Sequence, residues 1–74
     1  MKSLSEIKLR NVCEEKNIAL AQGKLDRVPI LQHRIEILKH IIHLQDELVH
    51  DDGKRELYLK HKIELLEDEL EKTR

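Results

Sequence analysis

Four histidines and two glutamates recur at alternating steps of three and four residues, at His33, Glu36, His40, His43, Glu47 and His50. On an α-helix this spacing places the six side chains along one side. Imidazole and carboxylate groups are ligands for Zn²⁺ and related ions. The row of residues, called the histidine stripe below, therefore has the chemistry of a metal site.

The position of the histidine stripe argues against an internal metal site. Glu47 and His50 form the Glu-x-x-His step that di-metal helical bundles repeat, but those bundles direct their ligands into the core. On a helical wheel the stripe lies opposite the apolar residues of the same segment. We therefore expect a solvated polar face with no metal and no cofactor. If an ion binds, the candidate ligands are His40, His43, Glu47 and His50. A third interpretation is a partner-binding face whose charge rises as the pH falls through the histidine range.

The apolar side of this segment spans two adjacent heptad rows. One row reads Leu31, Ile35, Leu38, Ile42, Gln45 and Val49, and the other reads Ile30, Arg34, Ile37, Ile41, Leu44 and Leu48. Steps of four and three keep each row on one helical face. Two rows form a face wider than one partner helix can fill. The helix is therefore predicted to lie centrally and to contact at least two others.

Start and stop signals divide the 74 residues into three helices within a single small domain, residues 1–74. The first helix is predicted over about residues 4–22, with Gly23 just past its end. The second is predicted over about 27–50 and the third over about 54–72. Because no run alternates β-branched and aromatic residues with polar ones, no strand is predicted. The predicted fold class is all-α.

The predicted helix starts depend on capping residues. Ser3 and Glu6 have the spacing of a capping box, with Ser5 as an alternative cap. Asp26 is predicted to cap the second helix, with the only proline in its first turn. The strongest break is residues 51–53, where two aspartates, both good caps, precede a glycine.

The short link at residues 51–53 predicts that the second and third helices form an antiparallel hairpin. The third helix has one narrow apolar seam, Leu59, Ile63, Leu66 and Leu70. The first helix is apolar on two sides: Ile7, Ile18, Ala21 and Leu25 form one side, and Leu9, Val12, Cys13 and Leu20 form the other. It closes the sides of the structure, and whether it packs on its own chain or on another copy is left open.

Self-association is expected because the chain is short and its single cysteine, Cys13, cannot form an internal disulfide. Two hairpins packed face to face would give a dimeric four-helix-type bundle. A monomeric three-helix bundle is the alternative. The predicted oligomer interface comprises Leu31, Arg34, Ile35, Leu38, Ile41, Ile42, Gln45, Leu48 and Val49.

Arg34 and Gln45 interrupt the apolar rows. Arg34 either extends its guanidinium to water or pairs with Glu14 or Glu15. Gln45 lies in the middle of the helix and is predicted to meet its own copy across a twofold axis, which would fix the register of the dimer.

The third helix carries its charges in the order that opposes its dipole. Basic residues are at its start (Lys54, Arg55, Lys60 and Lys62), and acidic residues are at its end. This order fits an ordinary solvated face, an antiparallel second copy that sets each basic start beside an acidic end, or a docking surface for a basic partner. The docking residues would be Glu64, Glu67, Asp68 and Glu71.

Composition excludes several functional classes. A net charge of −1 and an aromatic content of 1% provide neither the basic field nor the stacking surfaces of a nucleic-acid-binding protein. Two glycines cannot build a phosphate loop, and no nucleophile has a neighbouring base, so an enzyme is not expected. No apolar run is long enough for a membrane helix. With one cysteine and no signal peptide, a cytoplasmic location is expected.

The sequence thus favours a small helical protein–protein interaction module, a regulator or adaptor that binds another protein as well as itself. A structural subunit whose homo-oligomer is the function is the first alternative, and a metal-binding helical bundle is the second. The abundance of Lys, Glu and Ile fits an AT-rich bacterial or phage genome.

Overall fold

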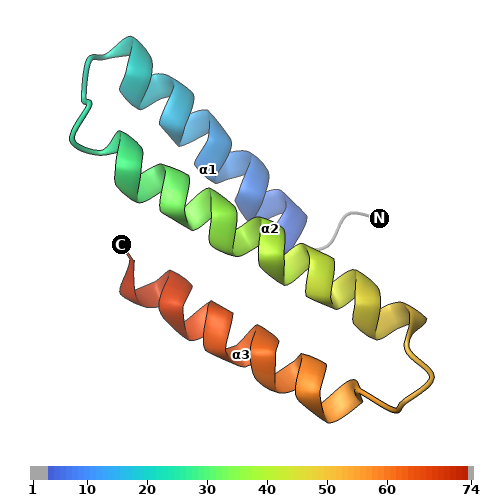
Figure 1. Cartoon of the computed structure of the whole chain (residues 1–74). Coiled ribbons are helices and arrows are strands. Elements are labelled where there is room, and N and C mark those ends of the chain that lie inside the picture. Colours follow the sequence, from blue (N-terminus) through green and yellow to red (C-terminus); the bar gives the residue numbers. More distant parts are fainter. Residues whose placement is uncertain (1–3, 74) are drawn as a thin grey trace.

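The computed structural model describes residues 4–73, and every regular element in that range is an α-helix (Figure 1). Helix α1 spans Leu4–Ala21, α2 spans Val28–His50 and α3 spans Glu56–Lys72. The predicted all-α fold with three helices is confirmed. The predicted bounds agree within one residue except at the start of α3, which begins two residues later than expected.

Helix α2 lies between the other two, as its two apolar rows predicted (Figure 1). Both α1 and α3 pack against α2, but α1 and α3 do not pack against each other. The Cα atoms extend over 47 × 26 × 12 Å, so the three helices form a single layer. Within this single chain α1 lies on α2.

The core follows the apolar rows of α2. This helix contributes six buried residues, Leu31, Ile35, Ile37, Leu38, Ile41 and Leu44. From α3 the predicted seam supplies the buried side chains of Leu59, Ile63 and Leu70, with Leu66 partly buried. From α1 only Val12 and Ala19 are buried. The seam of α3 is confirmed, and α1 is held by the thinnest part of the core.

One of the two apolar sides of α1 packs on α2. Val12 is buried, and Leu9 and Cys13 are partly buried against the core. Leu20, predicted on the same side, is exposed, and Ala19, predicted on neither side, is buried in its place. Ile7 and Ile18 on the other side are exposed. Burial of the Leu9 side leaves the Ile7 side without a partner in the described part of the chain.

The loop after α1 has the geometry expected of a glycine-terminated helix. Gly23 has a φ of 72°. Its N–H donates to the Leu20 carbonyl, and the Lys24 N–H donates to the Ala19 carbonyl at 2.9 Å. These two bonds satisfy carbonyl groups that the end of a helix otherwise leaves open, and the positive φ explains the choice of glycine.

The predicted cap of α2 is wrong by one residue. Arg27, not Asp26, is the N-cap of α2, and no side chain caps the helix. The Arg27 N–H donates to the Lys24 carbonyl, and this turn moves the helix start past Asp26. The proline is in the first turn as expected. At α1, Ser3 lies outside the described residues, and Ser5 is inside the helix and so is not its cap.

The loop between α2 and α3 is held by its aspartates. One carboxylate oxygen of Asp51 accepts hydrogen bonds from the N–H groups of Gly53 at 3.1 Å and Arg55 at 3.0 Å. Asp52 accepts one from the Lys54 N–H at 3.3 Å. The N-cap of α3 is Arg55, without a side-chain cap of its own. The aspartates were predicted as caps, but they fold the loop from outside the helix.

Candidate protein interaction surface

A trough runs along α2 between α1 and α3. The two outer helices pack on α2 but not on each other. Part of the surface of α2 that lies between α1 and α3 is therefore left uncovered. Three cavities of about 160, 250 and 350 Å³ mark the trough, and each is lined by residues of more than one helix. Their linings include Lys8 of α1, Arg34 and Gln45 of α2, and Glu67 and Leu70 of α3.

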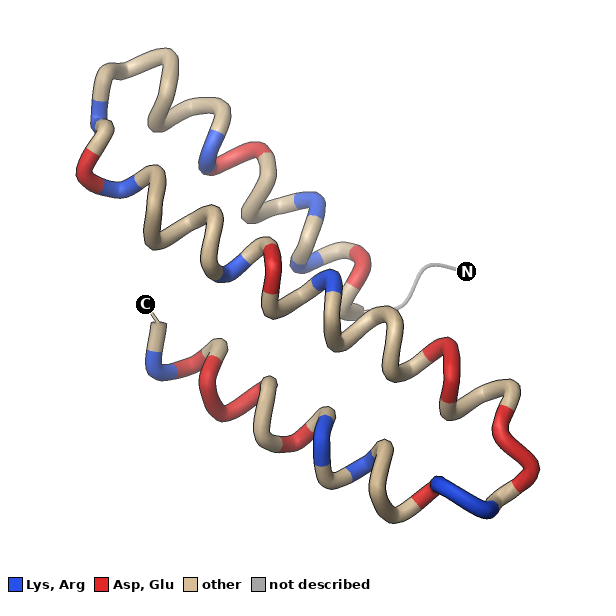
Figure 2. The backbone as a smooth tube through the Cα atoms, viewed as in Figure 1, with Lys and Arg blue, Asp and Glu red and all other residues tan. Residues whose placement is uncertain are grey.

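The α3 side of the trough is an acidic wall, which we define as Glu64, Glu67 and Glu71. Their spacing of three and four residues places them along one side of α3, and all three are exposed. None of them forms an ion pair within residues 4–73, and Lys8 lines the opposite side of the trough. Figure 2 shows the concentration of acidic residues toward the end of α3. The wall is therefore a row of like charges without neutralising partners in the described chain.

Asp68, the fourth predicted docking residue, has a different environment. Its carboxylate is 2.9 Å from the Lys72 ammonium group, one helical turn away. The hydrogen bond and charge of Asp68 raise the pKa of Lys72 above its usual 10.5. Asp68 is thus partly neutralised, whereas the acidic wall is not.

Arg34 lies in the trough with an unsatisfied donor. Its side chain lines a cavity together with Glu15 and Glu71, but it forms no ion pair with a described carboxylate. Its Nε is buried and has no hydrogen-bond partner among the described residues. The predicted pairing with Glu14 or Glu15 is not formed, and Glu14 instead lies 3.8 Å from Arg10. A buried N–H without an acceptor costs about 1–3 kcal/mol, so an acceptor supplied from outside would be favoured.

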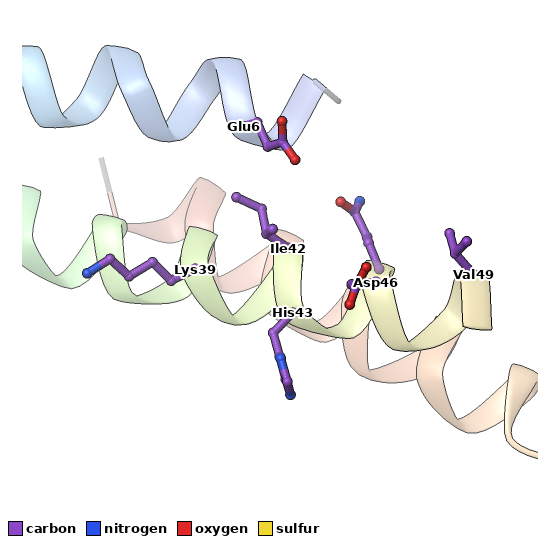
Figure 3. A pocket seen from close by; sticks show the side chains of 7 residues that line it. Glu6, Lys39, Ile42, His43, Asp46 and Val49 are labelled. Carbon is purple, nitrogen blue, oxygen red and sulfur yellow. The ribbon is translucent and has the colours of Figure 1, made fainter. Parts of the chain in front are cut away.

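Gln45 is partly buried where the trough meets a second depression of about 480 Å³. This depression lies near the start of α1, where Ile42 of α2 points toward Glu6 while His43 points away (Figure 3). Val49 also lines it and is 77% exposed, because α2 continues past the first residue of α1. The depression leaves part of one apolar row of α2 open.

The predicted oligomer-interface residues divide into three groups. Leu31, Ile35, Leu38 and Ile41 are buried within the single chain. Arg34, Ile42, Gln45 and Leu48 are partly buried, and Val49 is exposed. The buried group is covered by α1 and α3. A second copy could therefore contact only the partly buried and exposed residues, unless α1 or α3 moved away from α2.

The histidine stripe is exposed apart from the partly buried Glu47. His43 lies 3.3 Å from Glu47, and His50 lies 3.5 Å from Asp46. His33 lies 3.3 Å from Glu69 and so connects α2 to α3. Within residues 4–73, no three His, Cys, Asp or Glu side chains come together as a metal site would require. The stripe thus forms pairs along the surface.

Two features of this surface were not predicted from the sequence. Lys8 lines three of the trough cavities, and His33 contacts Glu69 across the helices. Lys8 lies on the same side of α1 as Val12 and Glu15, and this spacing is the only signal in the sequence that Lys8 lines the trough. Using that signal requires the angle at which α1 crosses α2.

The comparisons with known proteins add no family to this picture. Neither a protein-family model nor a curated protein or solved structure matches the chain. Across the part of the chain that the structure describes, no helix combines the length and apolar character needed to cross a bilayer.

Proposed function

We propose that this protein is a small cytoplasmic protein–protein interaction module, without catalytic activity, that regulates or links other proteins by binding them. The trough between α1 and α3 would receive a helix of the partner, since helices commonly bind in grooves between other helices. The observation that carries the proposal is the acidic wall, whose three carboxylates have no ion-pair partner within the described chain.

Charge and hydrogen bonding set the chemistry of the partner. A helix with basic residues on one side would neutralise Glu64, Glu67 and Glu71. An acceptor on the same helix would satisfy the buried Nε of Arg34. Charge complementarity of this kind contributes mainly to specificity and to the rate of association.

The shape of the chain supports a second candidate, a subunit whose assembly is the function. The radius of gyration is 14.0 Å, whereas a compact domain of this length has about 11 Å. The accessible surface is 5653 Å², against about 4,800 Å² for a compact protein of this mass. In this proposal α2 and α3 form an antiparallel hairpin, consistent with the contact of His33 near the start of α2 with Glu69 near the end of α3. Two such hairpins then associate into a four-helix-type bundle.

Partner capture from the native host tests the first proposal. The triple variant Glu64→Gln, Glu67→Gln and Glu71→Gln should lose a stoichiometric partner that the unmodified protein retains. The matched control carries Glu36→Gln, Asp46→Asn and Glu47→Gln on the side of the histidine stripe and should retain it. Both variants remove three negative charges, so a general effect of net charge would appear in both. Retention of the partner by the triple variant would contradict the role of the acidic wall.

A further inference from the structure

The side of α3 turned away from α2 carries a second unpartnered surface. Tyr58 and Leu65 are 53% and 54% exposed and lie one heptad apart. At 100° per residue they are about 130° around the helix from the buried seam of Leu59, Ile63 and Leu70. Neither residue lines the trough. We call this surface the outer face of α3. Within the helix it comprises Tyr58, His61, Lys62, Leu65, Asp68 and Glu69, the last at the edge that contacts His33 of α2. Lys54 and Arg55, which precede the first residue of α3, are included because Arg55 lies over the Tyr58 ring and Lys54 adjoins it in the chain.

The charges on the outer face are arranged symmetrically. Lys54 and Arg55 lie at one end, and Asp68 and Glu69 lie at the other. Lys54 and Arg55 are as far from the midpoint between residues 61 and 62 as Glu69 and Asp68 are, whereas Lys62 lies beside that midpoint and has His61 as its counterpart. Tyr58 and Leu65 are also equally distant from that midpoint. A surface with this pattern is complementary to itself when turned end for end.

We infer that the outer face of α3 binds a second copy of the chain, with the two α3 helices antiparallel. A twofold axis at the midpoint would place Tyr58 opposite Leu65 of the second copy. It would also place Lys54 and Arg55 near Asp68 and Glu69 of that copy. A twofold dimer requires such a self-complementary surface. The dimer extends the proposed function, because Tyr58 and Leu65 lie outside the trough, and only Asp68 belongs to both surfaces.

Intrachain contacts on the outer face are compatible with this pairing. Arg55 and Lys62 lie over the Tyr58 ring, at 5.4 and 5.8 Å from its centre. The Tyr58 side chain nevertheless stays exposed, so part of the ring is accessible to a second copy. Asp68 and Glu69 contact Lys72 and His33 in exposed pairs, and a carboxylate can accept further hydrogen bonds.

The charge order favours a second copy over an unrelated basic partner at this face. A uniformly basic helix would meet Asp68 and Glu69 favourably but would also face Lys54, Arg55 and Lys62. An antiparallel copy presents Asp68 and Glu69 where the first copy carries Lys54 and Arg55, and it presents His61 where the first copy carries Lys62. It also sets acidic groups beside the positive start of each helix, which relieves the unfavourable charge order of the isolated chain. Two apolar residues per copy make a small contact, so the dimer should form at tens to hundreds of micromolar.

Charge reversal gives a sharp test by sedimentation equilibrium. An acidic variant carries Lys54→Glu and Arg55→Glu, and a basic variant carries Asp68→Lys and Glu69→Lys. Each alone should dimerise about tenfold or more weakly than the unmodified chain, since both ends of its dimer would then repel. An equimolar mixture should form a heterodimer, because every end again pairs opposite charges. The backbone N–H groups of residues 54 and 55, which hold the loop, are kept in the acidic variant.

Matched variants separate this interface from general charge effects. Lys24→Glu with Arg27→Glu makes the same charge change in the α1–α2 loop, and Asp46→Lys with Glu47→Lys makes the opposite change on α2. Both should dimerise like the unmodified chain. Leu65→Arg should abolish the dimer, whereas Ile18→Arg, at a similarly exposed position on α1, should not. Circular dichroism would establish that each variant is folded.

Three results would overturn the inference. They are a monomeric unmodified chain at hundreds of micromolar, charge-reversed variants that dimerise normally on their own, and a mixture that remains monomeric. Partner capture through the trough is a separate measurement, so loss of the dimer with retained capture would leave the proposed function standing.

Discussion

At the residue scale, Arg34 shows how a charged side chain can be retained in a trough without an internal partner. Its Nε is buried and unsatisfied within the described chain. Arg34→Met keeps much of the apolar stem and removes this donor. We expect the free energy of unfolding to rise by about 1 kcal/mol, measured by urea denaturation. A fall in stability would mean that the guanidinium makes necessary contacts, and Arg34→Lys would then be expected to restore part of the loss.

Gln45 is the second polar residue in the apolar rows, and its position differs from that of Arg34. It is partly buried and lines the smallest of the three trough cavities together with Leu38 and Ile41. Gln45→Leu should raise the melting temperature by about 2–6 °C, because an apolar side chain replaces an amide in that cavity. Calorimetry measures the change, and His40→Leu on the exposed stripe is the control that should leave the melting temperature almost unchanged. A lower melting temperature for Gln45→Leu would show that the amide is needed where it is.

Asp68 controls the protonation of Lys72. Because the folded-state pKa of Lys72 is raised above 10.5 by the carboxylate, the pair stabilises the fold at pH values below 10.5 and loses that effect as the pH rises through the raised pKa. Asp68→Asn should lower the pKa of Lys72 toward 10.5, which NMR titration of the lysine side chain can follow. Glu64→Gln, one turn earlier, should leave the titration of Lys72 unchanged. An unshifted Lys72 in Asp68→Asn would contradict this assignment.

At the element scale, the loop between α2 and α3 is held by Asp51, a residue that lies before the first residue of α3. Asp51 accepts two backbone hydrogen bonds, whereas Asp26, which was predicted as a cap, caps no helix. Asp51→Ala should lower the free energy of unfolding by about 1 kcal/mol, and Asp26→Ala should change it by less than about 0.5 kcal/mol. Urea denaturation of both variants measures the difference. If both variants lost the same free energy of unfolding, the hydrogen bonds of Asp51 would not explain its contribution to stability.

The helices show where sequence reasoning succeeds and where it stops. The rows of α2 and the seam of α3 contain every buried residue of those two helices, because each pattern lies on one side of its helix. Ile30 and Val49, at the two ends of the rows, are nevertheless exposed. Helix α1 was ambiguous, since Ile7 and Ile18 on one side compete with Leu9 and Val12 on the other. Only packing against α2 selects between them. The acidic wall was found from charge alone, but its position opposite Lys8 depends on how two helices cross a third.

At the scale of the whole molecule, the single-layer arrangement of the three helices affects how the chain folds and unfolds. Helices adjacent in sequence account for all the helix packing, so few distant segments must meet before the fold forms. Chains with such local topology fold quickly, on the microsecond to millisecond scale. Because α1 and α3 share only α2, either one can leave without breaking contacts made by the other. We therefore predict that the chain opens as two cooperative units that have one helix in common.

Amide hydrogen exchange would reveal the two units separately. Val12→Ala removes a buried contact between α1 and α2, so exchange should accelerate throughout α1 and remain slow in α3. Leu59→Ala should do the reverse. Amides in the middle of α2, covered from both sides, should exchange only when both flanking helices are open. A protein built this way can release one end of its chain while the other end stays folded, so a partner could exchange places with a flanking helix while the rest of the fold persists.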